Sequence, residues 1–381
     1  MAAKGGLEGV VATTSSICHI DGEQGLLSYC GYDIHDLARE ATFEEVCHLL
    51  WHRRLPTRAE LGDLRSDLAA ARPLPEAMLR LVRTLPPGDA MDALRTLVSA
   101  LALIDPQADA RTGAAVQDPD TAYRTAVRLT AQVGSLVATW GRLAAGGGPV
   151  APDPALDHAA NVLLMLNGER PTREAARALD VALILHADHE LNASTFAARV
   201  TGATLSDVYS TAVAGIGALK GPLHGGANAE VMRMLLDLGE DAPDDVVERT
   251  IRGMLAKKQK VPGFGHRVYR TEDPRATHLR QMSETLSRQT ETRWFGMSRT
   301  IERVMKEVRR IDANVDFYSA STYHMLGIPI GLFTPIFAVS RIAGWTAHVL
   351  EQYANNRLIR PRADYTGAKP PQPFVPLGRR V

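Results

Sequence analysis

Cysteine is scarce in this chain. Its 381 residues include three cysteines, Cys18, Cys30 and Cys47, and no two of them have C-x-x-C spacing. This odd and sparse set excludes a disulfide framework and a zinc knuckle, and it is typical of a protein kept in a reducing compartment. We therefore expect a cytoplasmic protein.

An excess of charge of either sign is also absent. Lysine plus arginine and aspartate plus glutamate each number 43, so the formal net charge is +0. The chain as a whole therefore exerts no electrostatic attraction on nucleic acid or on an anionic membrane. Long hydrophobic runs are missing too: no segment approaches the length needed to span a bilayer, and Met1–Ser16 lacks the apolar core of a secretory signal. We expect neither a nucleic-acid partner nor a membrane partner.

What the sequence does contain is mostly helical periodicity. Apolar residues recur every three or four positions across Ala90–Ile104 and Thr121–Leu143, and Thr42 and Thr57 each begin a capping box. Convincing strands are absent except near the N-terminus, where Asp21-Gly22 between short apolar runs indicates a hairpin. A chain of 381 residues exceeds what one hydrophobic core usually serves. These patterns predict an all-α fold with two lobes and a small N-terminal β element.

A histidine stands between a proline and two glycines in the segment Gly221–Asn228, ahead of a run that is typical of a helix. Unpaired N–H groups and the positive end of the helix dipole disfavour a cationic imidazole there. A neutral His224 in that position could donate a hydrogen bond to a carbonyl that is becoming an enolate. The segment alone favours the simpler interpretation, a glycine-rich turn in which His224 is a polar cap.

Two histidines with neighbouring carboxylates end a strongly apolar helix, in His186-Ala187-Asp188-His189-Glu190. His186, His189 and Glu190 could bind a metal, and a metal-dependent hydrolase is one hypothesis. Their order is neither H-E-x-x-H nor H-x-x-E-H, and no further ligand is evident. A hydrogen-bonded pair that closes a buried helix is the better interpretation.

Further segments carry charge that local structure does not explain. The glycine-rich loop Gly263–Arg270, with Arg275 soon after it, has backbone N–H groups and arginines that suit phosphate or carboxylate groups. A solvated basic loop explains this segment equally well. Asp316 lies among aromatic residues, where desolvation would raise its pKa toward that of a working base, although a capped turn is commoner. Arg341 lies between apolar residues and needs an anionic partner, by default a protein carboxylate.

Taken together, these segments resemble the citrate synthase family over nearly the whole chain. Each matching motif is weak alone, but the ordered set is very specific. In chain order, the motifs are Ala187–Phe196, Gly221–Asn228, Gly263–Tyr269, Asp273–Arg275, Asn314–Ser319 and Arg360–Tyr365.

The resemblance implies a helical homodimer in which each subunit has two domains. Residues 1–225 and 327–381 would form the large domain, and 226–326 the small domain that closes over the substrates. The implied reaction is the condensation of acetyl-CoA with oxaloacetate, followed by hydrolysis of citryl-CoA to citrate and CoA. No metal and no redox cofactor is implied, because the CoA thioester is a substrate. The short N-terminal region resembles the dimeric branch of the family, which implies no inhibition by NADH.

Matched motif by motif, the resemblance also implies roles for individual residues. Asp316 would remove a proton from the thioester methyl group, His224 would donate to the thioester oxygen, and His266 would polarise the oxaloacetate carbonyl. The oxaloacetate-binding residues would be His189, Asn192, Arg275, Arg341 and Arg360, the last reaching the site of the partner subunit. The CoA-binding residues would be Arg270 and, less closely matched, Arg267, Lys258 and Arg309.

2-Methylcitrate synthase, which shares the fold and the catalytic residues but prefers propionyl-CoA, is the nearest alternative. One extra methylene changes discrimination by only about 1–3 kcal/mol, so a few pocket side chains decide between the two substrates. The runs Asp188–Asn192 and Phe317–Ser321 favour citrate synthase.

Overall fold

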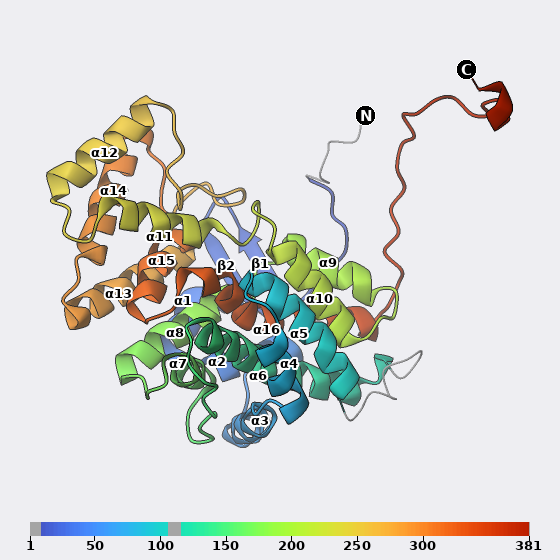
Figure 1. Cartoon of the computed structure of the whole chain (residues 1–381), viewed down its shortest axis with the longest axis horizontal. Coiled ribbons are helices and arrows are strands. Elements are labelled where there is room, and N and C mark those ends of the chain that lie inside the picture. Colours follow the sequence, from blue (N-terminus) through green and yellow to red (C-terminus); the bar gives the residue numbers. More distant parts are fainter. Residues whose placement is uncertain (1–8, 106–115, 381) are drawn as a thin grey trace.

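The computed structural model describes residues 9–105 and 116–380. In those ranges the chain forms a mostly helical body with one small sheet (Figure 1). Residues 1–8 lie outside the described ranges. They make up half of Met1–Ser16, the segment in which we expect no secretory signal. The α-helices are α1 (Ile34–Glu40), α2 (Phe43–His52), α3 (Arg58–Ala71), α4 (Glu76–Thr84), α5 (Ala90–Ile104), α6 (Pro119–Ala144), α7 (His158–Asn167), α8 (Arg173–His186), α9 (Ala193–Gly202), α10 (Val208–Leu219), α11 (Ala227–Leu238), α12 (Asp244–Ala256), α13 (Pro274–Thr290), α14 (Trp294–Arg309), α15 (Val315–Met325) and α16 (Phe333–Ala354).

The sheet lies at the start of the described chain. Strand β1 (Cys18–Asp21) pairs antiparallel with β2 (Leu26–Tyr29), which pairs antiparallel with β3 (Tyr32–Asp33). The side chain of Asp21 accepts from Glu23 N at 3.0 Å and from Gln24 N at 2.9 Å, which closes the first turn. The predicted all-α fold with a small N-terminal β element is confirmed.

Side-chain caps fix where the helices begin. Thr42 and Thr57 both form complete capping boxes, with Glu45 and Glu60 as the returning carboxylates, as the sequence predicts. These boxes satisfy N–H groups that the first turn of a helix leaves without an internal partner.

Helix α16 is the centre of the larger part of the molecule. It packs against α6, α8, α9 and α10, and most of its side chains are buried. By length and composition, the stretch Ile330–Ala354 could cross a membrane, so the expectation that no segment is long enough is wrong. However, 83% of its most apolar window is buried inside the protein, which is the property of a core helix.

Five consecutive helices gather on one side of this body, at the left of Figure 1. Among them, α11 and α13 pack on α15, and α12 packs on α14. Helix α13 also contacts α1 and α8, so it joins the group to the larger body. The group falls within residues 226–326, but the domain boundaries themselves stay a prediction.

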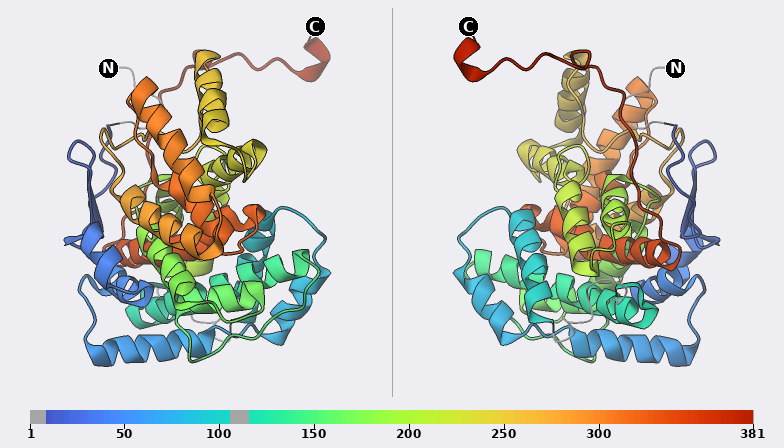
Figure 2. Two further views of the ribbon diagram at one scale, coloured as in Figure 1. Left: turned by 90° about the vertical axis from the view of Figure 1, so that its left-hand side faces the viewer. Right: turned by 90° about the vertical axis from the view of Figure 1, so that its right-hand side faces the viewer.

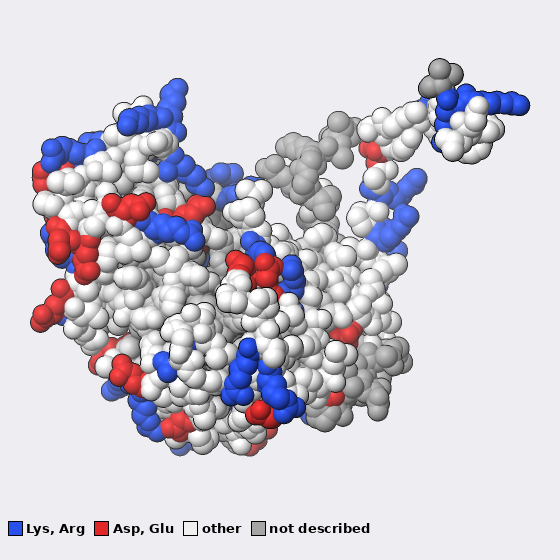
Figure 3. All heavy atoms as spheres, in the orientation of Figure 1, with Lys and Arg blue, Asp and Glu red and all other residues white. Residues whose placement is uncertain are grey.

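Both ends of the described chain leave the body. The segment after α16 runs outward as an extended tail with one short 3-10 helix, Leu377–Arg379, and nearly all its side chains are exposed (Figure 2). Figure 3 shows several Lys and Arg side chains along this tail, and on the drawn face of the body Lys and Arg are mixed with Asp and Glu.

Candidate active site

Some of the predicted site residues lie at the caps or first turns of helices. Asn192 caps α9, accepting from Ser194 N at 3.2 Å, and Asn314 caps α15, accepting from Asp316 N at 3.0 Å. Asp273 caps α13 and also accepts from Val315 N at 3.1 Å, which joins the starts of α13 and α15. Helix N-termini carry partial positive charge, so this arrangement suits an anionic ligand.

His224 is held by the start of α9. Its Nε2 atom accepts from Ser194 N at 3.2 Å and lies 2.8 Å from Ser194 Oγ, which accepts from Trp345 Nε1 at 3.1 Å. Because a backbone N–H can only donate, Nε2 carries no proton, and the proton of the neutral ring is on Nδ1. Burial lowers the pKa of His224 to about 4, and the charge of Arg341 acts in the same direction.

The position of His224 differs in one respect from the sequence expectation. The expectation placed the imidazole at the start of the helix that follows it, α11, which begins at Ala227. The N–H group that it meets belongs to the first turn of α9 instead. The ring is neutral as predicted, but burial and the charge of Arg341 lower its pKa, and the helix that supplies the N–H lies thirty residues earlier in the chain.

His266 is held by its own loop. Its Nδ1 atom accepts from Val268 N at 3.0 Å and from Tyr269 N at 3.2 Å, so the proton of the neutral ring is on Nε2. Burial lowers the pKa of His266 to about 4, with a smaller effect of the same sign from Arg275. The ring centroids of His266 and His189 are 5.4 Å apart.

Asp316 lies in the first turn of α15 and has an unusual carboxyl group. Burial raises its pKa to about 6, although Arg275 opposes the shift. Within residues 9–105 and 116–380 its carboxylate makes no hydrogen bond and no ion pair. Near neutral pH this group is therefore mostly ionised and able to accept a proton, and its side chain is partly exposed.

Two arginines are almost completely buried beside these groups. Arg275 is 3% exposed and binds both oxygens of Asp273, through Nε at 2.9 Å and Nη2 at 2.8 Å. Arg341 is 1% exposed, donates from Nε to His186 O at 2.7 Å and lies 4.7 Å from the Phe337 ring centroid. Burial lowers the pKa of Arg341 to about 10, so it stays charged. Both guanidinium groups retain N–H donors with no acceptor in the described part of the chain.

The other residues predicted to bind oxaloacetate are His189, Asn192 and Arg360. His189 Nε2 lies 3.2 Å from Tyr269 Oη, and burial lowers the pKa of His189 well below its usual value. Asn192 uses its amide for the cap of α9 and donates to Thr195 Oγ1 at 2.9 Å. Arg360 is exposed and lies in the tail that follows α16.

The geometry does not support the metal-site hypothesis. His186 donates from Nδ1 to Ala182 O at 2.7 Å, and its ring packs against Phe337, whereas His189 faces Tyr269. Among the described residues no group of three or more His, Cys, Asp or Glu side chains is arranged to hold a metal ion. The structure does not bring His186, His189 and Glu190 together as ligands.

The four residues predicted to bind CoA are exposed and lie on neighbouring segments. Lys258 N and Arg309 Nη2 both donate to Leu255 O, at 3.1 and 3.3 Å, at the end of α12. Arg267 and Arg270 belong to the loop 263–270, in which Gly265 N donates to Asp312 O at 3.1 Å. The loop therefore runs beside the segment that follows Arg309.

Several residues that organise the site were missed by the sequence reasoning. Asp273 had a usable signal, because an acidic residue before a proline is typical of a helix start. Ser194 and Tyr269 lie within the family motifs, but nothing in the sequence indicated their contacts or those of Trp345, since each acts through a residue far away in the chain or through its main chain.

Comparison with known proteins agrees with the geometry. The model of the family described as "Citrate synthase, C-terminal domain" matches residues 6–362. The chain is 52% identical to citrate synthase 2 of Bacillus subtilis over 384 aligned residues that cover 100% of both chains. It is 51% identical to the citrate synthase of Haloferax volcanii, over 99% of both chains. It is also 39% identical to the 2-methylcitrate synthase of Shewanella oneidensis, over 98% of this chain and 97% of the relative.

Solved structures show the same similarity. The citrate synthase of Pyrobaculum aerophilum superposes with a TM-score of 0.90 at 39% identity, over 98% of this chain and 95% of that one. The citrate synthase of Thermoplasma acidophilum, solved in a ternary complex with carboxymethyl coenzyme A and oxaloacetate, gives 0.88 at 31% identity over 98% of both chains. Fold and relatives thus define an all-α acyltransferase. The chain belongs to the citrate synthase family.

Proposed function

We propose that the chain condenses acetyl-CoA with oxaloacetate and hydrolyses the resulting citryl-CoA to citrate and CoA. One observation carries the proposal: two neutral histidines with opposite tautomers, and a carboxylate whose pKa is raised to about 6, each feel the charge of one of the two buried arginines, Arg275 and Arg341. Such a set can remove a proton from carbon and stabilise charge on two different carbonyl oxygens.

In the first step, Asp316 removes a proton from the thioester methyl group. This C–H bond is a very weak acid, so charge that develops on the thioester oxygen must be stabilised at the same moment. His224 does this through its Nδ1–H, because its Nε2 is already occupied by Ser194. The product of the step is an enolate of the thioester, hydrogen-bonded to the Nδ1–H of His224, and a protonated Asp316.

In the second step, the enolate carbon attacks the ketone carbon of oxaloacetate, so that a C–C bond forms as the C=O π bond opens. The ketone oxygen becomes a hydroxyl by taking a proton from Nε2 of His266, whose Nδ1 is occupied by main-chain N–H groups. The proton held by Asp316 then passes to His266 and restores its neutral ring. The free donors of Arg275 and Arg341 hold the two carboxylates, with His189 and Asn192 beside them. Water then cleaves the C–S bond of citryl-CoA, which releases citrate and the CoA thiol.

We also propose that the enzyme is a homodimer in which Arg360 completes the site of the partner subunit. In support, Arg360 lies in an exposed tail that leaves its own body. The tail and the segment 10–16 line a groove of about 980 Å³. A second copy of the chain is the occupant that this proposal assigns to the groove. Light scattering of the purified protein tests it, because a mass near 41.3 kDa would indicate a monomer and contradict the proposal.

The remaining parts of the proposal concern CoA, cofactors and location. Exposed basic side chains at Lys258, Arg267, Arg270 and Arg309 support contacts with the phosphates of CoA. The proposed reaction needs no metal and no redox cofactor, because neither the condensation nor the hydrolysis requires an oxidant or a reductant and side chains of the site move the protons of the condensation. Sparse cysteines without C-x-x-C spacing support a cytoplasmic location.

A second candidate, 2-methylcitrate synthase activity, is favoured by the relative from Shewanella oneidensis. Steady-state kinetics with oxaloacetate and either acetyl-CoA or propionyl-CoA decides between the two. We expect kcat/KM to be higher for acetyl-CoA by about tenfold or more, the discrimination that one methylene typically gives. A clear preference for propionyl-CoA would overturn the first choice, and turnover of neither thioester would overturn the proposed reaction.

A further inference from the structure

Helix α16 supports the segment 186–190 at three points. Arg341 Nε donates to His186 O at 2.7 Å, and two turns later His348 Nε2 lies 3.1 Å from Asp188 Oδ2. Between them, a side chain at Gly344 would place its Cβ 2.2 Å from Ala187 O and 2.7 Å from Asp188 Oδ1. Only glycine allows this close approach, so the segment rests directly on the helix backbone.

The protonation of His348 follows from its second neighbour. Arg199 Nη1 lies 3.1 Å from His348 Nδ1, and because a guanidinium can only donate, Nδ1 is the acceptor. The proton of the neutral ring is therefore on Nε2, and it is donated to Asp188 Oδ2. Both His348 and Asp188 are completely buried, so this orientation has no competition from water.

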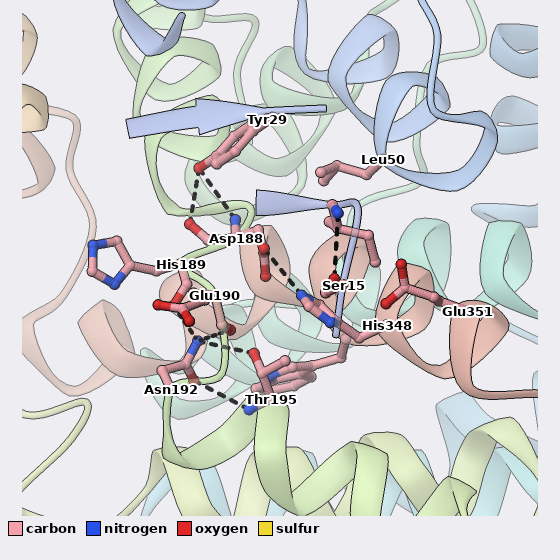
Figure 4. A network of polar contacts seen from close by, with 12 residues as sticks. Ser15, Tyr29, Leu50, Asp188, His189, Glu190, Asn192, Thr195, His348 and Glu351 are labelled. Atoms are coloured by element: carbon pink, nitrogen blue, oxygen red, sulfur yellow. Dashed lines mark hydrogen bonds and ion pairs between the residues drawn. The ribbon is translucent and has the colours of Figure 1, made fainter. Parts of the chain in front are cut away.

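Asp188 joins this support to the oxaloacetate-site residues. Its main chain is held by Tyr29, whose Oη donates to Asp188 O at 2.9 Å, and its side chain points toward His348 while His189 projects elsewhere (Figure 4). Its Oδ1 atom is buried without a hydrogen bond in the described chain. The carboxylate is the main group that opposes the burial-induced fall in the pKa of Arg341. Asp188 thus acts on the neighbouring His189 through the backbone and on Arg341 through its charge.

The segment needs such support because its end is conformationally disfavoured. Glu190 adopts φ 53°, in the left-handed region that residues with a Cβ rarely occupy. Its carbonyl accepts from Asn192 Nδ2 at 3.3 Å. A segment with this backbone keeps its shape only when the surroundings fix it.

The outer end of the same chain of contacts lies at the surface groove. Arg199 also donates to Glu351 Oε2 at 2.6 Å and to Gln352 Oε1 at 3.2 and 3.1 Å. Glu351 Oε1 accepts from Ser16 N at 2.9 Å, and Gln352 Nε2 donates to Arg357 O at 3.2 Å. Arg199 is therefore the junction between the buried segment and both chain ends, including the tail that carries Arg360.

We propose that Asp188, His348 and Arg199 are positioning residues for oxaloacetate binding. They fix the segment 186–190 on α16, so that His189 and the charged Arg341 face the substrate in one arrangement. The inference rests on the proposed function, in which His189 and Arg341 hold a dicarboxylate. None of the three residues touches the reacting atoms, and each acts through the next.

Two substitutions of His348 distinguish a positioning role of this side chain from a purely space-filling role. In His348→Gln, the amide oxygen can accept from Arg199 and the amide nitrogen can donate to Asp188, so the pattern survives. His348→Leu has a similar volume and neither group. We expect His348→Leu to raise the KM for oxaloacetate by about tenfold or more, with a much smaller change in the KM for acetyl-CoA. His348→Gln should restore most of the loss.

Oxaloacetate affinity, measured by calorimetry without the thioester, gives a readout that needs no turnover. The Kd should rise for His348→Leu by about the same factor as the KM. The proposal is overturned if His348→Leu binds oxaloacetate as the unchanged protein does, or if Gln is as harmful as Leu. If the unchanged protein binds oxaloacetate but does not turn it over, the proposed reaction fails while the positioning test still runs.

Asp188→Asn provides a second variant in case His348→Leu does not fold. It keeps the size of the side chain and an oxygen acceptor for His348, and it removes the negative charge beside Arg341. We again expect weaker oxaloacetate binding, by about tenfold, with acetyl-CoA affected less. An unchanged oxaloacetate Kd in a folded Asp188→Asn protein would contradict the role given to its charge.

Discussion

The segment around His224 and the loop around His266 reach the same chemical state in different ways. Burial lowers the pKa of each histidine to about 4, so both rings are neutral donors. His224 accepts at Nε2 from Ser194, and His266 accepts at Nδ1 from Val268 and Tyr269. Their free N–H groups are therefore on different ring atoms.

The two histidines differ in the origin of the N–H groups that fix their tautomers. The donors to His266 lie two and three residues further along its own loop. The donor to His224 lies thirty residues away on α9, and its hydroxyl is in turn held by Trp345 of α16. The position of the free N–H of His266 is thus set by the local backbone conformation. That of His224 depends on how three distant elements pack. Changes in packing should therefore affect His224 more than His266.

Asp316→Asn should give the largest effect, because both histidines stabilise charge that appears only after Asp316 has taken a proton. The amide cannot accept that proton, so we expect kcat to fall by about 10²–10⁴. Oxaloacetate affinity, measured by calorimetry, should change little. Asp312→Asn, a nearby carboxylate paired with Lys306 at 2.9 Å, is the matched control. Near-normal turnover of Asp316→Asn would show that another group is the base.

When each of the two histidines is replaced by Asn or by Gln, the variant that retains the higher kcat should differ between the two positions. The nitrogen of Asn occupies the place of ring Nδ1, and that of Gln the place of ring Nε2. We therefore expect His224→Asn to retain more kcat than His224→Gln, and His266→Gln to retain more than His266→Asn. The poorer variant of each pair loses a donor to a developing oxyanion, which typically costs about 10²–10³ in kcat. The same order at both positions would show that one of the assigned tautomers is wrong.

The acid limb of the pH profile should report Asp316 and neither histidine. The pKa of Asp316 is raised to about 6 and those of His224 and His266 are lowered to about 4. As pH falls through 6, Asp316 gains a proton and loses its function as a base, while both histidines stay neutral. We expect kcat/KM for acetyl-CoA to fall by about tenfold per pH unit below that value. Circular dichroism over the same range controls for unfolding, and a midpoint near 4 would contradict the assignment.

The sequence predicted the local features of this molecule well. The capping boxes at Thr42 and Thr57 and the hairpin at Asp21 depend on residues a few positions apart, and the structure has them all. The helical class follows from periodicity, which reports burial along one element at a time. The family motifs added the candidate site residues, because their order along the chain is specific even where each motif is weak.

Sequence reasoning failed where the decisive contact joins distant segments. Nothing near His224 indicates that Ser194 fixes its tautomer, and nothing near Asp188 indicates that it accepts from His348. The apolar length of α16 was missed because its polar members, such as Arg341 and His348, interrupt the run. In the fold both side chains are buried and hydrogen-bonded, Arg341 to His186 O and His348 to Arg199, so the helix forms the core despite them.

Ser194→Ala should give the smallest effect and tests the difference between the two histidines most finely. It removes Oγ, which lies 2.8 Å from His224 Nε2 and accepts from Trp345 Nε1, but keeps the N–H group that fixes the tautomer. One lost hydrogen bond is worth about 1 kcal/mol, so kcat/KM should fall by about fivefold. Val268→Ala keeps its N–H and trims a side chain that is 40% exposed, so it should affect His266 less. Because Trp345 loses its acceptor, Ser194→Ala should also lower Tm. An equal fall in kcat/KM for Ser194→Ala and Val268→Ala would contradict the proposed dependence of His224 on packing.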